Sequence, residues 1–287
     1  MKIFLALLII ASTTACTTFQ PSALDYGSVE LDTKRTPLNY GVYTPPNWDA
    51  SERLPVILFL HGGGGSHLSF ERYRGHLELD RLITAGEIGR AVVVFPNGDN
   101  GFWENWADGS RHYRDWVIDT LLPQVQRQYR TLECPTHCHL VGISMGGFGA
   151  LRFAHFKPDT FESVSAISAP IFTKPNERPS LLLRILIPFK RIFGDVGSTN
   201  VKNTNPYYSW VENRLDKKMR LQLIWGDDDH TGIREANENF SKRLEKHKID
   251  FSSLVYQGGH KWKYWVPTIK EVMSFSLQNS NPIETQP

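Results

Sequence analysis

Short, unbroken runs of apolar residues recur along this chain, and each ends in a turn rich in glycine, proline or aspartate. Leu54–Leu60 leads into His61-Gly-Gly-Gly-Gly65, and Arg90–Phe95 ends at Pro96-Asn-Gly98. A strand that is apolar along its whole length is typical of a parallel sheet covered on both faces. Further strands are expected at residues 39–48, 139–143, 161–167, 221–225 and 251–256.

Segments with the helical spacing of apolar residues lie between these runs. They cover residues 113–129, with a kink at Pro123, and residues 147–156, 234–247 and 265–277. Strands that alternate with helices predict the α/β class: a mostly parallel central sheet with right-handed crossovers and helices on both faces. We expect one such domain over residues 36–278, after an anchor or linker at 16–35 and before a frayed tail at 279–287.

One segment, residues 170–219, interrupts this alternation with about fifty residues. A connection of this length is usually functional or holds structure of its own, so we expect a cap-like insertion. Inside it, Leu181–Phe193 is apolar and carries three cations. This stretch is interpreted as a core-packed helix kinked at Pro188, as a cap over a functional site, or as a membrane contact.

The N-terminal residues predict export. Met1-Lys2 gives a positively charged start, Ile3–Ile10 is apolar, and Ala11-Ser-Thr-Thr-Ala-Cys16 has the small residues of a cleavage site. This pattern is typical of a secretory signal peptide, here residues 1–15. A cysteine in this place resembles the lipobox of bacterial lipoproteins, although Thr13 stands where that motif usually has Leu. We therefore expect a protein of the periplasm or cell envelope, lipid-anchored to a membrane through Cys16, with ordinary signal cleavage as the alternative.

The charge balance and the cysteines limit which ligands and cross-links the chain can be expected to have. The chain has 32 basic and 30 acidic residues, and this balance predicts no nucleic-acid partner. Besides Cys16, the cysteines are Cys134 and Cys138. In an exported protein these two can form a disulfide that closes a small loop. Free thiols, or a zinc site with the adjacent histidines, are the alternatives, although the spacing is not that of the usual zinc knuckle.

The strand expected at 139–143 runs into Gly142-x-Ser144-x-Gly146, and a helix is expected directly after it. Between a strand and a helix this pattern is typical of a nucleophile elbow, a turn so tight that only glycine fits two residues on either side of the serine. Ser144 is therefore a candidate nucleophile, with its hydroxyl exposed at the carboxyl edge of the sheet.

A serine hydroxyl becomes a nucleophile when a neighbouring base takes its proton, and a carboxylate must hold that base in the correct tautomer. His260 follows the strand at 251–256 and a Gly-Gly pair, and the aspartates Asp227-Asp-Asp229 follow the strand at 221–225. The chain order Ser, Asp, His, each at a strand end, is that of a doubly wound hydrolase. Backbone amides of Met145 and of the glycine loop at 61–65 are expected to hold an oxyanion.

Taken together, these segments resemble the esterase D branch of the α/β-hydrolase superfamily. That branch contains S-formylglutathione hydrolases, feruloyl and acetylxylan esterases, tributyrin-type esterases and mycolyltransferase-like enzymes. The resemblance covers about residues 36–278 and is carried by residues 43–46, 58–65, 94–98, 113–123, 142–150, 225–229 and 258–265. It implies a serine hydrolase that cleaves carboxylic esters through an acyl-enzyme, with neither metal nor cofactor.

The resemblance also implies roles for single residues. Asp229, three residues after the glycine that ends its strand, corresponds to the triad acid, with Asp228 as the alternative. Gly63 and Met145 are expected to form the oxyanion hole, with Gly62 as the other candidate on the loop.

Trp103 resembles a position near the acyl pocket, although it suits the core equally. The substrate stays open, as a small-molecule or polysaccharide-linked ester, because export and the insertion fit poorly with a cytosolic formylglutathione hydrolase. A serine peptidase or thioesterase of the same fold is one alternative function, and a catalytically inactive binding protein of the cell envelope is another.

Overall fold

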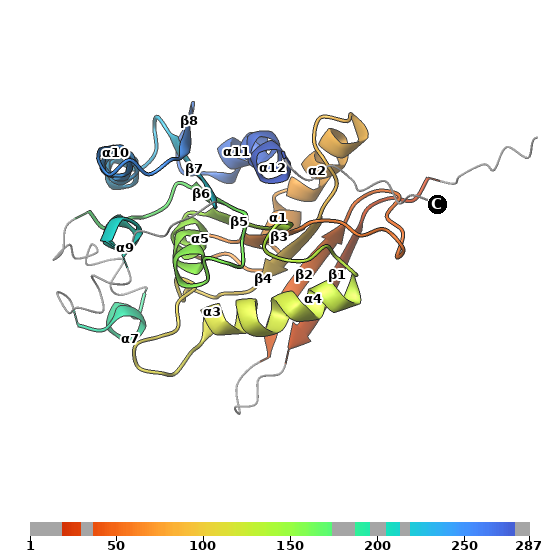
Figure 1. Cartoon of the computed structure of the whole chain (residues 1–287), viewed down its shortest axis with the longest axis horizontal. Coiled ribbons are helices and arrows are strands. Elements are labelled where there is room, and N and C mark those ends of the chain that lie inside the picture. The colour runs from red at the N-terminus through yellow and green to blue at the C-terminus, as the bar shows by residue number, and fades with distance from the viewer. Residues whose placement is uncertain (1–18, 30–36, 174–186, 196–204, 213–218, 279–287) are drawn as a thin grey trace, which may run out of the picture.

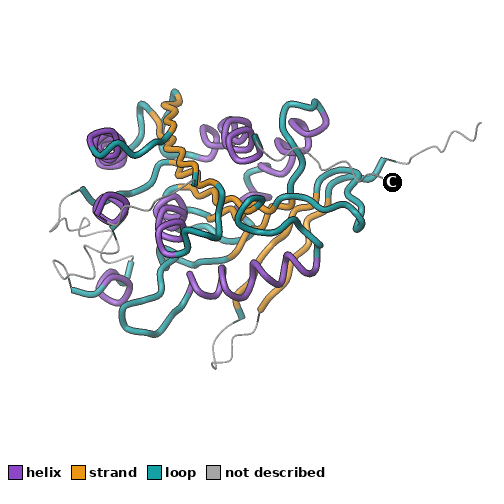
Figure 2. The backbone as a smooth tube through the Cα atoms, in the orientation of Figure 1, coloured by secondary structure: helices purple, strands orange, loops and turns teal. Residues whose placement is uncertain are grey.

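The computed structural model describes residues 19–29, 37–173, 187–195, 205–212 and 219–278. An eight-stranded sheet crosses the molecule in the order β1-β2-β4-β3-β5-β6-β7-β8 (Figures 1 and 2). β2 pairs antiparallel with β1 and β4, and all other neighbours are parallel, which confirms the predicted α/β sheet. The strands are β1 (Ala23–Val29), β2 (Leu38–Thr44), β3 (Val56–Leu60), β4 (Val92–Pro96), β5 (Cys138–Ile143), β6 (Ser163–Ile167), β7 (Arg220–Gly226) and β8 (Ser252–Tyr256).

β1 corrects the expectation that residues 16–35 are only an anchor and linker. Residues 23–29 form an edge strand whose register with β2 runs from Ala23 opposite Thr44 to Val29 opposite Leu38. None of its side chains is fully buried, so the strand lacks the apolar run that marks the inner strands. The signal peptide at 1–15, Cys16 and the tail at 279–287 lie outside the described residues.

Helices cover both faces of the sheet because side chains alternate along each strand. In β3, Val56, Leu58 and Leu60 face one apolar cluster, and Ile57 and Phe59 face the other. The first cluster packs α3 (Tyr113–Asp115), α4 (Leu122–Gln128), α5 (Met145–Phe156), α7 (Phe189–Phe193), α9 (Pro206–Glu212) and α10 (Thr231–Lys246). The second packs α1 (Ser69–Arg72), α2 (Gly75–Thr84), α11 (Trp262–Trp265) and α12 (Ile269–Leu277), and Figure 1 shows α2, α11 and α12 together above the sheet.

Prolines divide two of the expected helices. Between α3 and α4 the chain forms a wider π-helical turn, Trp116–Leu121, and Pro123 lies in the first turn of α4. Pro267 lies in a 3-10 turn, Val266–Thr268, that separates α11 from α12. Proline has no backbone N–H to donate, so a regular helix gives way around it.

The expected insertion at 170–219 is described only in part, since residues 174–186, 196–204 and 213–218 lie outside the described chain. α7 covers the end of the apolar stretch 181–193, and its Phe189, Ile192 and Phe193 are buried. Phe193 packs edge-on against Phe102 and Phe148. For its described part, the stretch is therefore a core-packed helix. Within the described residues, no helix has both the length and the apolar character that a membrane crossing requires.

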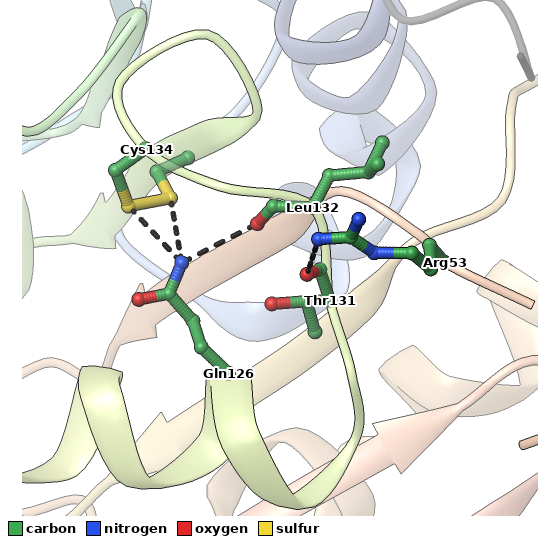
Figure 3. Close-up of a disulfide and its surroundings, with 6 residues drawn as sticks. Arg53, Gln126, Thr131, Leu132 and Cys134 are labelled. Carbon is green, nitrogen blue, oxygen red and sulfur yellow. Dashed lines mark hydrogen bonds between the residues drawn. A yellow bond between two sulfur atoms is a disulfide. The ribbon is translucent and has the colours of Figure 1, made fainter.

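A disulfide joins Cys134 to Cys138, the first residue of β5 (Figure 3). The side-chain amide of Gln126 contacts both sulfurs, at 3.6 and 3.9 Å, and donates a hydrogen bond to the Leu132 carbonyl at 3.3 Å. The bridge therefore closes the loop before β5, and Gln126 links this loop to the end of α4. Sulfurs joined in this way cannot serve as thiolate ligands, so the zinc interpretation of this cluster does not fit.

Candidate active site

Ser144 occupies the turn between β5 and α5 with φ 55° and ψ −120°. A residue with a side chain rarely adopts a positive φ, and such strain gathers at functional sites. Gly142 and Gly146 on either side of Ser144 must be glycine, because neighbouring backbone atoms leave no room for a Cβ at either position. A Cβ on Gly142 would lie 1.9 Å from the Gly146 carbonyl oxygen, and a Cβ on Gly146 would lie 2.0 Å from that of Leu60.

His260 links Ser144 to Asp229. Its Nε2 lies 2.8 Å from Ser144 Oγ, and its Nδ1 lies 2.8 Å from Asp229 Oδ1. A carboxylate can only accept here, so Nδ1 carries the proton and donates it to Asp229. Nε2 is then the acceptor for the serine hydroxyl. Three residues that follow β5, β7 and β8 thus form one hydrogen-bonded chain.

The structure distinguishes between the three consecutive aspartates. The Asp229 side chain is buried and also accepts the His230 amide at 2.8 Å. Burial raises the pKa of its carboxyl, and the hydrogen bonds from His260 and other donors lower it. The lowering is the larger effect, so the pKa lies below the usual value. Asp227 instead accepts the Gly258 amide at 2.8 Å, and Asp228 is exposed.

The glycine loop at 61–65 passes beside Ser144. A Cβ on Gly62 would lie 3.2 Å from the Ser144 Cβ, so the loop backbone approaches the serine as closely as glycine permits. Among the described residues, the amides of Gly63 and Met145 have no hydrogen-bond partner. They can therefore donate to an oxyanion that forms in front of Ser144.

His61 fixes the shape of this loop. The Gly98 amide donates to its Nε2 at 3.0 Å, so Nδ1 carries the ring proton and donates to the Gly62 carbonyl at 2.8 Å. The Gly64 amide donates to the Asn100 side chain at 2.7 Å. Gly98 and Asn100, which follow β4, thus fix the glycine loop that follows β3 by hydrogen bonds.

Comparison with known proteins identifies the family. The family model described as "Putative esterase" matches residues 32–275. The chain belongs to the Esterase family. An acetyl esterase from Caldicellulosiruptor saccharolyticus is 21% identical over 222 residues, which cover 75% of this chain and 80% of that protein. The match confirms the expected family and the expectation of a carboxylic ester hydrolase.

Solved structures share the fold of this esterase. A ferulic acid esterase superposes with a TM-score of 0.76 at 21% identity, over 91% of this chain and 99% of that one. An S-formylglutathione hydrolase from Staphylococcus aureus superposes with a TM-score of 0.73 at 20% identity, over 89% of this chain and 99% of that one. The α/β-hydrolase fold is confirmed.

Of the two positions expected for Trp103, the acyl pocket and the core, the structure shows the core. Its side chain is fully buried, and its Nε1–H donates to the His61 carbonyl at 3.2 Å. A Cβ on Gly149 would lie 2.6 Å from Trp103, so the tryptophan fills the space between α5 and the loop. Trp103 therefore supports the glycine loop at 61–65 from the core side.

A pocket of about 560 Å³ opens over Ser144 and His260. One side is the glycine loop, which includes Gly62, and the other is formed by the ends of α1 and by α11 with the residue before it. The remaining lining residues are Gly63–Gly65, Ser69, Arg72, Tyr73, Lys261–Lys263 and Trp265. The volume suits a small-molecule ligand.

Three residues that sequence reasoning missed pack behind the His260–Asp229 pair. The Trp265 ring meets His260 edge-on at 4.8 Å, and its Nε1–H donates to the Tyr256 hydroxyl at 2.9 Å. That hydroxyl lies 3.0 Å from Ser168 Oγ, and Ser168 has a positive φ of 51° at the end of β6. Only its place directly after a strand, at the same edge as Ser144, could have indicated Ser168.

Two buried histidines make the esterase sensitive to acid. Burial lowers the pKa of His61 to about 4 and that of His139 to about 3. An unfolded histidine titrates near pH 6.5, so below that pH the unfolded chain takes up protons that the folded chain does not. The stability that these neutral histidines contribute is complete above about pH 6.5 and is lost as the pH falls toward 4.

We expect urea unfolding to show this loss directly. Each histidine should contribute a slope of about 1 kcal/mol per pH unit between about pH 6 and pH 4. Replacing His139 by Gln should reduce the slope, whereas His112→Gln, at an exposed position, should leave it unchanged. Equal slopes in both variants would contradict the assignment of the acid sensitivity to buried histidines.

Proposed function

We propose that this esterase cleaves its substrates through an acyl-enzyme formed on Ser144. The observation that carries the proposal is the hydrogen-bonded chain from Ser144 through His260 to Asp229. As the serine oxygen attacks the ester carbonyl, its proton moves to His260 Nε2, and Asp229 stabilises the imidazolium that results. The amides of Gly63 and Met145 donate to the oxyanion of the tetrahedral intermediate.

The same residues complete the turnover. His260 returns the proton to the departing alcohol oxygen as the bond from carbonyl carbon to alcohol oxygen breaks, which leaves the acyl group on Ser144. A water molecule then attacks the acyl carbonyl, with His260 as the base, and releases the carboxylic acid. Similar proteins are named for acetyl and ferulic acid esters, so acetyl and feruloyl esters are the first substrates to test.

A fluorophosphonate probe tests this chemistry directly, because it phosphonylates a serine that a neighbouring histidine activates. We expect one covalent adduct per chain, located on Ser144 by mass spectrometry of the peptides. His260→Gln should slow the labelling by about 10³-fold or more. Ser110→Ala, at a serine that bonds Arg191 outside the site, should leave it unchanged. An intact, folded chain that stays unlabelled would support an inactive binding protein instead.

We further propose that the esterase is exported and anchored through a lipid on Cys16, and that it acts on small-molecule or polysaccharide-linked esters. The support for export and for the lipid anchor is the sequence at 1–16 alone. In a detergent phase separation of cells that produce the full chain, the protein should enter the detergent phase, and Cys16→Ala should move it to the aqueous phase. The double variant C134S/C138S should stay with the detergent. A Cys16→Ala protein that still enters the detergent would exclude the lipid anchor.

A further inference from the structure

The pocket over Ser144 has a one-sided charge. Arg72 from the end of α1 and Lys261 and Lys263 from the α11 segment line it, and none of its lining residues in the described part of the chain is acidic. All three cations are exposed. The chain as a whole is nearly neutral, with a formal net charge of +2, so this field is local to the pocket.

None of the three cations has a salt-bridge partner within the part of the chain that the structure describes. Glu71, the neighbour of Arg72, accepts the Tyr26 hydroxyl instead. Lys263 lies 4.6 Å over the ring of Tyr264, a contact that keeps its charge.

Two cations elsewhere on the same face of the sheet, Arg81 and Lys270, are neutralised, whereas Arg74 has no salt bridge within the described residues. Arg81 of α2 pairs with Glu78 and Glu87, each at 2.8 Å, and Lys270 of α12 pairs with Glu87 at 2.8 Å. Arg72, Lys261 and Lys263 have no such partner within the described residues, and all three line the pocket over Ser144. An exposed cation that no protein carboxylate neutralises can attract an anion from solution.

The wall between these cations is aromatic. The rings of Tyr73 and Trp262 are stacked, with their centroids 4.7 Å apart and an angle of 11° between their planes, and both residues line the pocket. Tyr73 is 43% exposed, so the stack presents an apolar surface to a bound ligand. A flat group can rest on this wall while an anionic substituent reaches Arg72 on one side or the lysines on the other.

We infer that the preferred substrates are esters that carry an anionic group, such as a carboxylate, close to the scissile bond. The inference rests on the proposed function, because it assigns the 560 Å³ pocket to the substrate of Ser144. The three cations attract the anion during encounter and hold it once bound, so the preference should appear in kcat/KM and should weaken with salt.

Two matched pairs of esters test the preference, and they place the anion on opposite sides of the scissile bond. The first pair is 4-carboxyphenyl acetate and 4-carbamoylphenyl acetate, with the anion on the alcohol. The second is 4-nitrophenyl 4-carboxybenzoate and its 4-carbamoyl analogue, with the anion on the acyl group. Each kcat/KM is divided by the rate constant of alkaline hydrolysis, which removes differences in intrinsic reactivity. At about 20 mM salt, the anionic member of at least one pair should be preferred by about tenfold or more.

Charge removal locates the cause. The triple variant R72Q/K261Q/K263Q should lower the ratio of kcat/KM for the anionic ester to kcat/KM for its neutral partner by about tenfold. The control R81Q/K242Q/K270Q removes the same total charge outside the pocket and should keep the preference. About 0.5 M NaCl should reduce the preference in the wild type but change little in the triple variant.

The inference is overturned if the wild type hydrolyses both members of both pairs with kcat/KM values within about twofold. A preference that the pocket variant keeps, or that the control loses equally, would also overturn it. Failure of the wild type to hydrolyse any of the four esters would count against the proposed function instead, because the neutral esters need no anion site.

Discussion

Replacing Ser144 by alanine should reduce the kcat for 4-nitrophenyl acetate by about 10⁴-fold or more, with no loss of stability. The change removes only Oγ, whose described hydrogen bond is to His260. Alanine keeps the Cβ, so the backbone strain at φ 55° is the same before and after. Steady-state kinetics gives the activity, and thermal unfolding of the same preparation should give a melting temperature within about 2 °C of the wild type.

A pair of adjacent variants provides the control for this experiment. Asp229→Asn leaves the geometry in place but favours the wrong tautomer of His260, so kcat should fall by about 10⁴-fold. Asp228→Asn removes the same charge one residue away, at an exposed side chain, and should keep kcat. Activity retained by Ser144→Ala would place the nucleophile elsewhere, and equal losses in the two aspartate variants would exclude a specific role for Asp229.

Gly146→Ala should prevent the esterase from folding stably, with a loss of more than about 4 kcal/mol in the free energy of unfolding. The new Cβ would lie 2.0 Å from the carbonyl oxygen of Leu60, at the end of the central strand β3. No side-chain rotation can relieve a clash with backbone, so β3 and α5 would have to separate. Soluble yield and urea unfolding measure the effect.

Gly232→Ala is the matched control for the elbow glycine. Gly232 lies in the first turn of α10, and a Cβ there would meet nothing within 4 Å. Alanine is the better helix former, so this variant should be as stable as the wild type or more stable by about 0.5 kcal/mol. A Gly146→Ala protein with wild-type stability would mean that the elbow can relax, which would contradict the tight packing described here.

The inner strands and the core of the site were predictable from the sequence because their signals are local. A parallel strand buried on both faces must be apolar throughout, and Ser144 stands in a glycine-rich turn directly after such a strand, β5. His260 follows the edge strand β8, which has no buried residue, and its signal was the Gly-Gly pair after that strand. The edge strand β1 has no buried side chain, so its pattern did not differ from that of a linker.

Other features depend on contacts between distant segments. The direction in which each aspartate points in the turn after β7 decides whether Asp228 or Asp229 bonds His260, and residue type alone does not distinguish the two. Trp103 is in the core because Gly98 and Gly149 leave room for its ring, a fit between three segments that no spacing reveals. Ser168 belongs to no motif, and its place beside Tyr256 follows from the pairing of β6 with β7 and of β7 with β8.

The two sides of the pocket have different structural origins. Ser144, Asp229 and His260 stand on turns that follow strands of the sheet, whereas Arg72, Tyr73 and Trp262 lie in or next to short helical segments at the surface. Mutations can therefore change the helical wall without unfolding the sheet that aligns Ser144, His260 and Asp229. A lineage with this architecture can acquire a new ester as its substrate through a few surface substitutions while the rate of the bond-breaking step is preserved.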